Sequence, residues 1–411
     1  MSRLLSGYRV VESGALLNSA SIGMLLADLG ADVIKLESPF LGDYLRAHND
    51  QTYLHHQANK SKRSVALDLR KPEGKRAAYA LISTADAFVT NAVADRNDRI
   101  GLGYEQLREV NPSIVYCQHT GYGAVGPYAE VPTHGQMMDA LAGATPVEMC
   151  EDGFVRPAVG KHQPRIGSLQ MAGEGTMMGA LFGALHVAAA LAGRAVNGEG
   201  AYIDVAASAA VVASAWPSAV RGDGARRPEH PGLARYQYYQ TSDEHFVLFC
   251  PEERKFWETF CHIVGRSDLR PEVYGEPLRH EIQSIIGSRT LDEWLTIARE
   301  HRLPIGPAHR DISEVVDDPQ MRSRQIFVDP PFPAPGIARL VGSPALVAGQ
   351  PYEVVRPAPE LGEHTDEILA ELGYAPTDLQ SMRTSFVTSA EHGPDLGHIT
   401  EVNGQPHPPA G

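Results

Sequence analysis

The first 120 residues alternate between short apolar runs, typical of buried strands, and longer segments with apolar positions every three to four residues, typical of helices. The expected strands are Arg9–Ser13, Ala31–Glu37, Asp86–Thr90 and Ser113–His119, and the expected helices are Ser19–Leu29, Pro72–Thr84 and Tyr104–Val110. Pro72 favours a helix start and Gly30 a helix end. Strands that alternate with helices predict an α/β domain with a parallel sheet covered on both faces.

The middle of the chain changes character twice. Gly173–Val220 predicts two Ala-rich helices separated by a turn at Gly193–Gly200, and such small side chains require close packing against other elements. Arg221–Pro231 is polar and rich in Pro and Gly, which is typical of a linker. The segments that follow predict a small α+β domain. They comprise a strand pair within Gln237–Cys250 and helices at Lys255–Val264, Glu276–Ile286 and Leu291–Glu300.

Charge and composition exclude several classes of protein. The 36 Lys and Arg residues against 50 Asp and Glu give a net charge of −14, which would repel a nucleic-acid backbone. No apolar stretch reaches the ~20 residues of a membrane span, and the N-terminus has no hydrophobic signal core. The four cysteines form no CxxC pair and the 17 histidines no HExxH spacing, so we expect reduced thiols and no metal. These observations favour a cytoplasmic protein without nucleic-acid or membrane partners.

Ligands of parallel sheets bind at the carboxyl ends of the strands. The loops to examine are therefore Ser13–Asn18, Ser38–Arg46, Asn91–Arg99 and Thr120–Pro127. The first of these lacks the GxGxxG pattern, which weakens a dinucleotide interpretation.

Basic residues gather in one short segment of this acidic chain. Seven lie within 17 positions: Lys60, Lys62, Arg63, Arg70, Lys71, Lys75 and Arg76. Such a cluster suits a multiply phosphorylated small ligand. A solvated helix face with intrahelical ion pairs is the alternative interpretation.

Several long motifs resemble one known family. They are LLADLGADVIKLE from Leu25, GDYLR from Gly42, NKSKRSVALDLRKPEG from Asn59, the segment from Ile100 to Ala129, PIGPAHRDISEVVDDPQMRSRQIF from Pro304, and LGEHTDEILAELGY from Leu361. In this order they resemble the class III coenzyme A transferases, also called CaiB/BaiF proteins. That group includes formyl-CoA transferase, carnitine CoA transferase and α-methylacyl-CoA racemase. A shared fold does not by itself fix the reaction.

The resemblance implies a Rossmann-like large domain built from both ends of the chain and two subunits interlocked like chain links. The expected division is a large CoA-binding domain at 1–222, a small α+β domain at 232–328 and a return segment at 329–388 that completes the large domain. Residues 389–411 are rich in Gly, Pro and His with few core residues, so we expect a disordered tail.

The resemblance also implies coenzyme A as a substrate and points to the residues that hold it. By position, Leu67 and Arg70 in ALDLR, Asn91 in VTN and Arg99 before IGLG match CoA contacts of the family. The residue types suit the role, because Arg forms forked charge-assisted hydrogen bonds to phosphate. Structural roles for Asn91 and Arg99 are the alternative.

The nucleophile of the family is missing. In relatives an Asp attacks the acyl-CoA thioester, giving a mixed anhydride and then an aspartyl-CoA thioester. Its position, ahead of the first Ala-rich helix, corresponds to Gly173, and Glu174 follows immediately. Glu174 is therefore the candidate nucleophile, since a desolvated carboxylate could perform the same chemistry. An acidic residue that only stabilises the helix N-terminus is the alternative.

A second hypothesis is proton chemistry on an acyl-CoA, as in the racemase branch. His134 in PTHGQ matches the His of that branch, and His titrates near neutrality without help. Gly135 stands where that branch has an Asp; Asp139, one helical turn further on, is a substitute or an ordinary polar residue. Glu253 in CPEERKFW matches a Glu of the racemase branch and is a secondary candidate, with a surface charge as its alternative.

A third hypothesis follows from Gly173. Some relatives are heteromers in which one subunit lacks the nucleophile, so this chain could form a heterodimer with an Asp-bearing homologue instead of an interlocked homodimer. The default expectation is a CoA transferase that moves coenzyme A between an acyl-CoA and a carboxylic acid.

Overall fold

The computed structural model describes residues 4–46, 52–157, 173–220, 234–271, 275–333 and 337–389, and the backbone of 401–402 and 405–406. The chain divides into two compact units. Unit 1 is formed by residues 1–220 and 325–411, and unit 2 by residues 221–324. Each unit has its own hydrophobic core and is described by itself. The predicted tail, residues 389–411, lies almost entirely outside the described residues.

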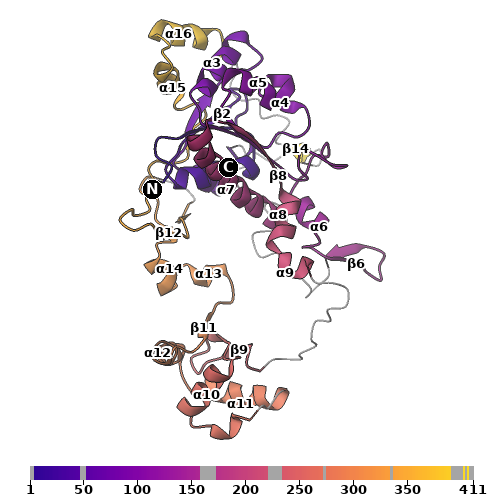
Figure 1. The fold of residues 1–411 in the computed structure, drawn as a ribbon, viewed down its shortest axis with the longest axis vertical. Coiled ribbons are helices and arrows are strands. Elements are labelled where there is room, and N and C mark those ends of the chain that lie inside the picture. Colours follow the sequence, from indigo (N-terminus) through magenta and orange to yellow (C-terminus); the bar gives the residue numbers. More distant parts are fainter. Residues whose placement is uncertain are drawn as a thin grey trace. The chain divides into compact units, whose positions relative to one another are not determined.

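Unit 1 is built on a six-stranded parallel sheet (Figure 1). The strands are β1 (Arg9–Ser13), β2 (Asp32–Glu37), β3 (Arg63–Ala66), β4 (Ala87–Thr90), β5 (Val115–Thr120) and β8 (Ala201–Ala206). Their order is β3-β2-β1-β4-β5-β8, and Val10 on central β1 lies opposite Val33 on one side and Ala87 on the other. This is the doubly wound Rossmann order, with the direction of winding reversed between β1 and β4. The predicted α/β fold is confirmed.

Helices cover both faces of the sheet, because side chains alternate along each strand. One core contains Val11, Ile34, Phe88 and Tyr116 beneath α3 (Pro72–Ser83) and α5 (Tyr104–Val110). The other contains Val10, Val33, Val89 and Cys117 beneath α1 (Leu17–Asp28) and α7 (Glu174–Asn197). In Figure 1, α3 and α5 lie on one side of the sheet and α7 on the other.

Helix α7 packs closely because its buried face is made of small residues. A Cβ added to Gly179 would lie 2.1 Å from Nε2 of His119, and one added to Gly183 would lie 2.5 Å from Cδ1 of Ile22. Among the described residues α7 is the one helix long and apolar enough to cross a membrane. Its buried residues Ala180, Val187 and Leu191 instead belong to the core beneath the sheet.

The predicted start of the second Ala-rich helix is wrong. Helix α7 extends into the expected turn and ends at Asn197, and Ala201–Ala206 forms β8, the edge strand beside β5. Helix α8 begins only at Ala207. The remaining elements of this part are α2 (Thr52–Asn59), α4 (Arg96–Ile100), α6 (Met137–Leu141), α8 (Ala207–Ser214), α9 (Trp216–Ala219) and the hairpin β6–β7 (Val147–Met149 and Val155–Pro157).

Unit 2 is the expected small α+β fold. Its antiparallel sheet has the order β11-β10-β9, formed by Ile305–Ala308, Phe246–Phe249 and Gln237–Gln240. The helices are α10 (Arg254–Ile263), α11 (Glu276–Ile286), α12 (Leu291–His301), α13 (Ile312–Val315) and α14 (Pro319–Ser323). The core centres on Trp257, Phe260 and Trp294, and Thr290 caps α12 through a capping box with Glu293.

The chain returns to unit 1 after residue 324. Strands β12 (Phe327–Val328) and β13 (Leu340–Val341) pair, and α15 (Thr365–Glu371) and α16 (Pro376–Thr384) follow. The hydroxyl of Thr365 accepts a 3.0 Å hydrogen bond from the Ala66 amide, and the His364 amide donates to the Ser64 carbonyl at 3.0 Å. The two ends of the chain therefore build unit 1 together.

Candidate active site

A cleft opens at the carboxyl edge of the sheet in unit 1, and it has a volume of about 640 Å³ including its open mouth. All four loops predicted to carry a ligand site contribute to its lining. Its lining comprises Leu16, Leu17, Asn18, Leu45, Asn91, Val93, Thr120, Gly121, Thr133, His134, Gly135, Met138 and Thr176. The loops after β1 and β4 meet here, at the point where the winding of the sheet reverses.

Asn91 fastens these two loops together. Its side-chain amide donates to the Ala15 carbonyl at 2.7 Å, and its Oδ1 accepts from the Ala15 amide at 3.2 Å. The next residue, Leu16, has φ +62°, a conformation that a branched side chain adopts at a cost of about 1–3 kcal/mol. The Leu16 amide donates to Asp43 at 3.1 Å, so the loops after β2 and β4 both fix the loop after β1.

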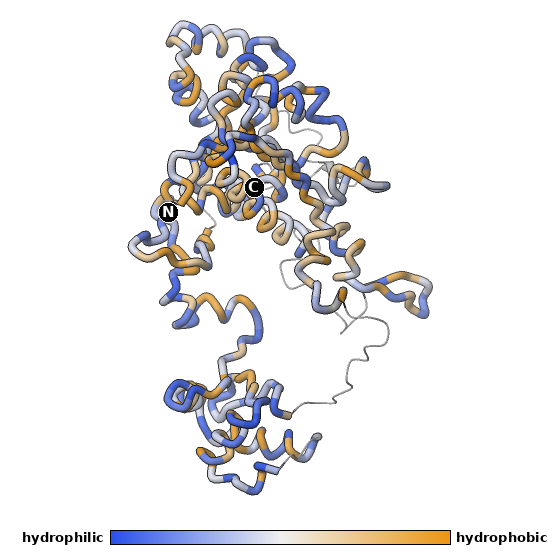
Figure 2. Tube along the Cα trace, viewed as in Figure 1, coloured by the Kyte–Doolittle hydropathy of each residue, from blue (hydrophilic) through white to orange (hydrophobic). Residues whose placement is uncertain are grey.

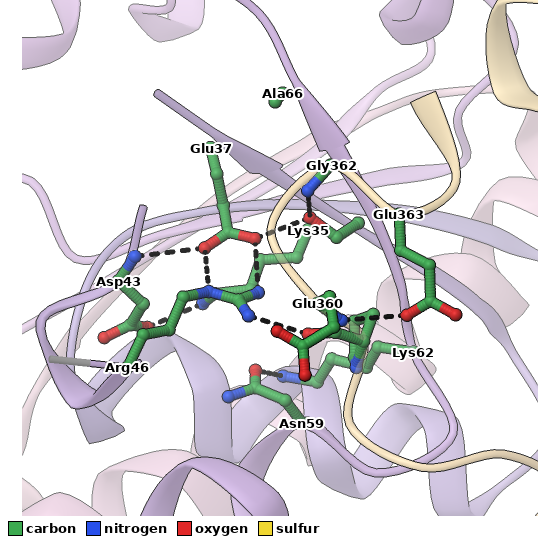
Figure 3. Close-up of polar contacts among 12 residues, drawn as sticks. Lys35, Glu37, Asp43, Arg46, Asn59, Lys62, Ala66, Glu360, Gly362 and Glu363 are labelled. Atoms are coloured by element: carbon green, nitrogen blue, oxygen red, sulfur yellow. Dashed lines mark hydrogen bonds and ion pairs between the residues drawn. The ribbon is translucent and has the colours of Figure 1, made fainter. Parts of the chain in front are cut away.

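Buried charges anchor the loop after β2. Lys35 pairs with Glu12 at 2.7 Å and with Asp43 at 2.9 Å, and all three side chains are fully buried. Lys62 pairs with the second oxygen of Glu12 at 2.5 Å. Burial would raise the pKa of Glu12, but the two lysines together hold it below its ordinary value. Figure 3 shows Lys35 and Asp43 within this arrangement.

A second set of contacts joins that loop to the return segment. Arg46 forms a forked ion pair with Glu37, at 3.0 Å from Nε and 2.7 Å from Nη2, and it donates to the Pro359 carbonyl at 2.7 Å (Figure 3). The Ser64 hydroxyl donates to Glu37 at 2.6 Å and accepts from the Gly362 amide at 2.9 Å. Asp43 and Arg46 of the GDYLR segment therefore fix the position of the loop after β2, which forms part of the cleft wall.

One carboxylate beside the cleft has an unsatisfied oxygen. Asp139, on α6, accepts a 2.9 Å hydrogen bond at Oδ1 from the Gly175 amide, in the first turn of α7. Its Oδ2 is buried and has no hydrogen-bond partner among the described residues, and the residue is only 2% exposed. A Cβ added to Gly173 would lie 1.7 Å from this oxygen. Burial raises the pKa of Asp139, and the neighbouring charge of Glu174 raises it further.

Comparison with known proteins decides the family. The sequence model of CoA-transferase family III matches residues 5–365. The chain belongs to CoA-transferase family III.

Named relatives cover almost the whole chain. The succinate–glutarate CoA-transferase of Agrobacterium fabrum is 31% identical over 401 residues, which cover 90% of this chain and 95% of the relative. The succinyl-CoA:mesaconate CoA-transferase of Haloarcula hispanica is 29% identical over 401 residues, covering 90% and 96%. A crystal structure of a CaiB/BaiF family protein from Brucella suis superposes with a TM-score of 0.69 at 26% identity, covering 90% of this chain and 100% of that one.

The residues that the family III resemblance assigns to CoA follow the carboxyl edge of the sheet. Asn91 reaches the cleft. Arg70 is largely exposed, pairs with Asp68 at 2.8 Å and lies 4.4 Å from the centre of the Phe40 ring. Arg99 is exposed and pairs with Asp95 at 3.3 Å. Leu67 is 1% exposed, so its side chain belongs to the core.

Three of the seven residues of the basic cluster are internal, which contradicts the phosphate interpretation for those three. Lys60 and Lys62 are fully buried and pair with Asp28 and Glu12 at 2.5 Å each. Arg63 is 6% exposed and pairs with Asp32 at 2.5 Å and with Glu371 at 2.6 Å. The solvated alternative fits Arg76, whose partner Glu73 lies one helical turn away. Sequence alone could not separate these cases, because the partner carboxylates lie far away along the chain.

The three predicted catalytic residues lie in different settings. His134 lines the cleft and is exposed. Glu174 is the first residue of α7 and is half-buried. Glu253 is exposed and immediately precedes α10 in unit 2. Asp139 gave a weaker signal in the sequence, as a polar residue one turn from Gly135. Thr133 and Thr176, which also line the cleft, gave none.

No cluster of three or more His, Cys, Asp or Glu side chains suited to a metal occurs in the part of the chain that the structure describes.

Proposed function

We propose that this protein transfers coenzyme A between an acyl-CoA and a carboxylic acid, with dicarboxylates as the substrate class. The observation that carries the proposal is the family match over residues 5–365, together with a cleft at the winding reversal of the sheet. Two relatives named above are CoA-transferases for succinate, glutarate or mesaconate, and another, from Acetobacter aceti, is an acetyl-CoA:oxalate CoA-transferase. The activities in these names have a short dicarboxylate as acceptor in common, which supports that class of acceptor acid here.

The test is direct transfer by the purified chain. Succinyl-CoA is offered with glutarate, mesaconate, oxalate or acetate, and the acyl-CoA products are identified by mass. We expect a new acyl-CoA with at least one dicarboxylate and little product with acetate. Absence of any new acyl-CoA, in a protein that unfolds cooperatively, would contradict the proposal.

We further propose that Asn91, Arg70 and Arg99 contact the coenzyme A. Their support is their place: Asn91 directly follows β4, Arg70 follows β3, and Arg99 lies in α4, in the connection after β4, toward the edge of the sheet where ligands of this fold bind. The exposed guanidinium groups of Arg70 and Arg99 have the charge and geometry that phosphate requires. For Leu67 the main chain is the available contact, since its side chain is buried.

Proton chemistry on the acyl-CoA is the second candidate, and the place of His134 in the wall of the cleft favours it. An imidazole there could exchange a proton with the α-carbon of a bound thioester. Incubation of each acyl-CoA in deuterated water tests this function. Deuterium at the α-carbon without CoA transfer would support it, and transfer without exchange would contradict it.

We also propose that the working protein is a dimer located in the cytoplasm. Large apolar side chains are exposed on unit 1: Leu185 and Trp216 are each 61% exposed, and Phe154 is 66% exposed. Figure 2 shows the hydrophobic character of α7, which carries Leu185. All four cysteines are free, as expected in a reducing compartment. Light scattering distinguishes a homodimer from a monomer, and transfer that requires a second, Asp-bearing protein would indicate the heterodimer.

A further inference from the structure

We propose that Asp139 supplies the carboxylate nucleophile in place of the Asp that this chain lacks at position 173. The inference rests on the proposed transferase function and names the residue that carries the acyl group. It differs from the sequence-based hypothesis, in which Glu174 takes this role.

The first argument is steric. The Oδ2 atom of Asp139 lies 1.7 Å from the point at which a Cβ on Gly173 would stand. Real atoms do not approach so closely, so a side chain at position 173 and the observed carboxylate of Asp139 exclude each other. Gly173 therefore leaves open the volume into which an Asp at that position would project. The carboxylate of Asp139, which comes from a different helix, fills it.

The second argument concerns the hydrogen bonds of the Asp139 carboxylate. Its Oδ1 accepts the Gly175 amide at 2.9 Å, and Oδ2 has no partner among the described residues although it is buried. A residue that served only to cap α7 would be expected to use both oxygens or to leave the second one in water. A desolvated oxygen with a free lone pair is instead what nucleophilic attack requires.

The third argument is position. Met138, the neighbour of Asp139 in the chain, lines the cleft, and so does Thr176, the neighbour of Gly175. The carboxylate thus lies between two elements whose adjacent residues form the cleft wall. The 24-residue helix α7 points its N-terminus at the carboxylate, which favours negative charge there. Glu174, by contrast, is half-buried.

The chemistry balances without a redox partner. An oxygen of Asp139 attacks the thioester carbonyl, the C–S bond breaks, and a mixed anhydride and CoA thiolate form. The thiolate then attacks the Asp139 carbonyl carbon and releases the donor acid, leaving an aspartyl-CoA thioester. The acceptor carboxylate repeats both steps in reverse order. As a result, one oxygen of the acceptor acid remains on Asp139 after each complete cycle.

The first measurement compares transfer by the unsubstituted chain with that by Asp139→Asn, which keeps the size of the side chain and an acceptor for the Gly175 amide. We expect at least a ~1,000-fold loss of transfer, with an unfolding temperature close to that of the parent. Asp318→Asn is the matched control. Asp318 accepts two backbone amides at the start of α14 in unit 2, at 2.8 and 3.1 Å, so this change removes a similar capping charge away from the cleft.

A second variant moves the carboxylate back to the position used by the family. Asp139→Ala alone should be inactive, whereas Asp139→Ala combined with Gly173→Asp should recover transfer, because the new side chain projects into the vacated volume. A purely structural role for Asp139 predicts no such recovery.

Transfer of an oxygen isotope to Asp139 gives a measurement that a change in protein stability cannot produce. With succinyl-CoA and glutarate labelled with heavy oxygen, the peptide containing Asp139 should gain label during turnover, and hydroxylamine should modify the same peptide. Label at Glu174, or full transfer by Asp139→Asn, would overturn the assignment and leave the proposed function intact. Failure of the unsubstituted chain to transfer would overturn both.

Discussion

His119 lies fully buried near the end of β5, between the first turn of α1 and Gly179 of helix α7. Its Nδ1 lies 3.1 Å from the Asn18 carbonyl, and its Nε2 has no partner among the described residues. The Nδ1–H therefore donates to Asn18, and the ring is neutral. Burial lowers the pKa of His119 to about 4.

This lowered pKa predicts that the folded protein becomes less stable as the pH is lowered. The unfolded chain binds a proton at His119 near pH 6.5 and the folded chain only near pH 4, so the folded state loses stability as the pH falls between these values. Relative to His119→Phe, the native protein should lose on the order of 3 kcal/mol of unfolding free energy between pH 7 and pH 4. Urea unfolding at several pH values measures the difference. Equal pH dependence in the two proteins would contradict the prediction, and His280→Phe, at an exposed position, provides the control.

Asn91 can be tested as a residue that fixes the conformation of the loop after β1. Asn91→Ala removes both hydrogen bonds to Ala15 and should lower the free energy of unfolding by about 1–3 kcal/mol. Because these bonds hold Leu16 in its strained conformation, CoA affinity should fall as well, which calorimetry measures. Asn111→Ala is the matched control. Asn111 donates to the Ile82 and Ala85 carbonyls away from the cleft, so its loss should cost similar stability and leave affinity unchanged.

At the scale of elements, two glycines of α7 give opposite predictions. Gly179→Ala gains helix propensity of about 1 kcal/mol, but the added methyl would meet His119 at 2.1 Å, so we expect a net loss of about 1–3 kcal/mol. Gly193→Ala places its methyl in open space and should stabilise by about 0.5–1 kcal/mol. Thermal unfolding of both variants measures the contrast. A stabilising Gly179→Ala would show that α7 can move away from the sheet.

Hydrophobic patterning predicted β1, β2, β4 and β5 because their apolar runs are bounded by helix signals. It missed β3, since Arg63 and Ser64 are polar and their burial depends on partners such as Glu37 and Glu371. It mistook β8 for helix because this strand, AYIDVA, continues directly into the Ala-rich helix α8 at Ala207 without a Gly or Pro between them. The cleft loops could be predicted, because all parallel strands end at one edge. The contact between Asp139 and Gly173 could not, because it depends on how α6 packs against α7.

At the scale of the whole molecule, unit 1 depends on the return segment. Five of its side chains belong to the core beneath α3: Ile368, Leu369, Leu379, Met382 and Val387. Their burial contributes on the order of 10 kcal/mol, comparable with the total stability of a typical domain. Arg63 on β3 also pairs with Glu367 and Glu371 on α15, which joins the first strands to the last helices. Without this segment, the exposed core of unit 1 should prevent its folding.

A truncation after Arg356 tests this dependence, and the tryptophans distinguish the units. Trp257 and Trp294, 1% and 0% exposed, lie in unit 2, whereas Trp216, 61% exposed, lies in unit 1. In the truncated chain we expect the far-UV ellipticity to fall and CoA binding to disappear. Because unit 2 keeps its core, its tryptophan emission should remain blue-shifted and should change in a single cooperative transition when the unit is unfolded. A truncation after Ser389 retains all five side chains and should preserve both signals. Retention of CoA binding by the shorter chain would show that the strands and helices before residue 221 suffice, and that the return segment only reinforces them.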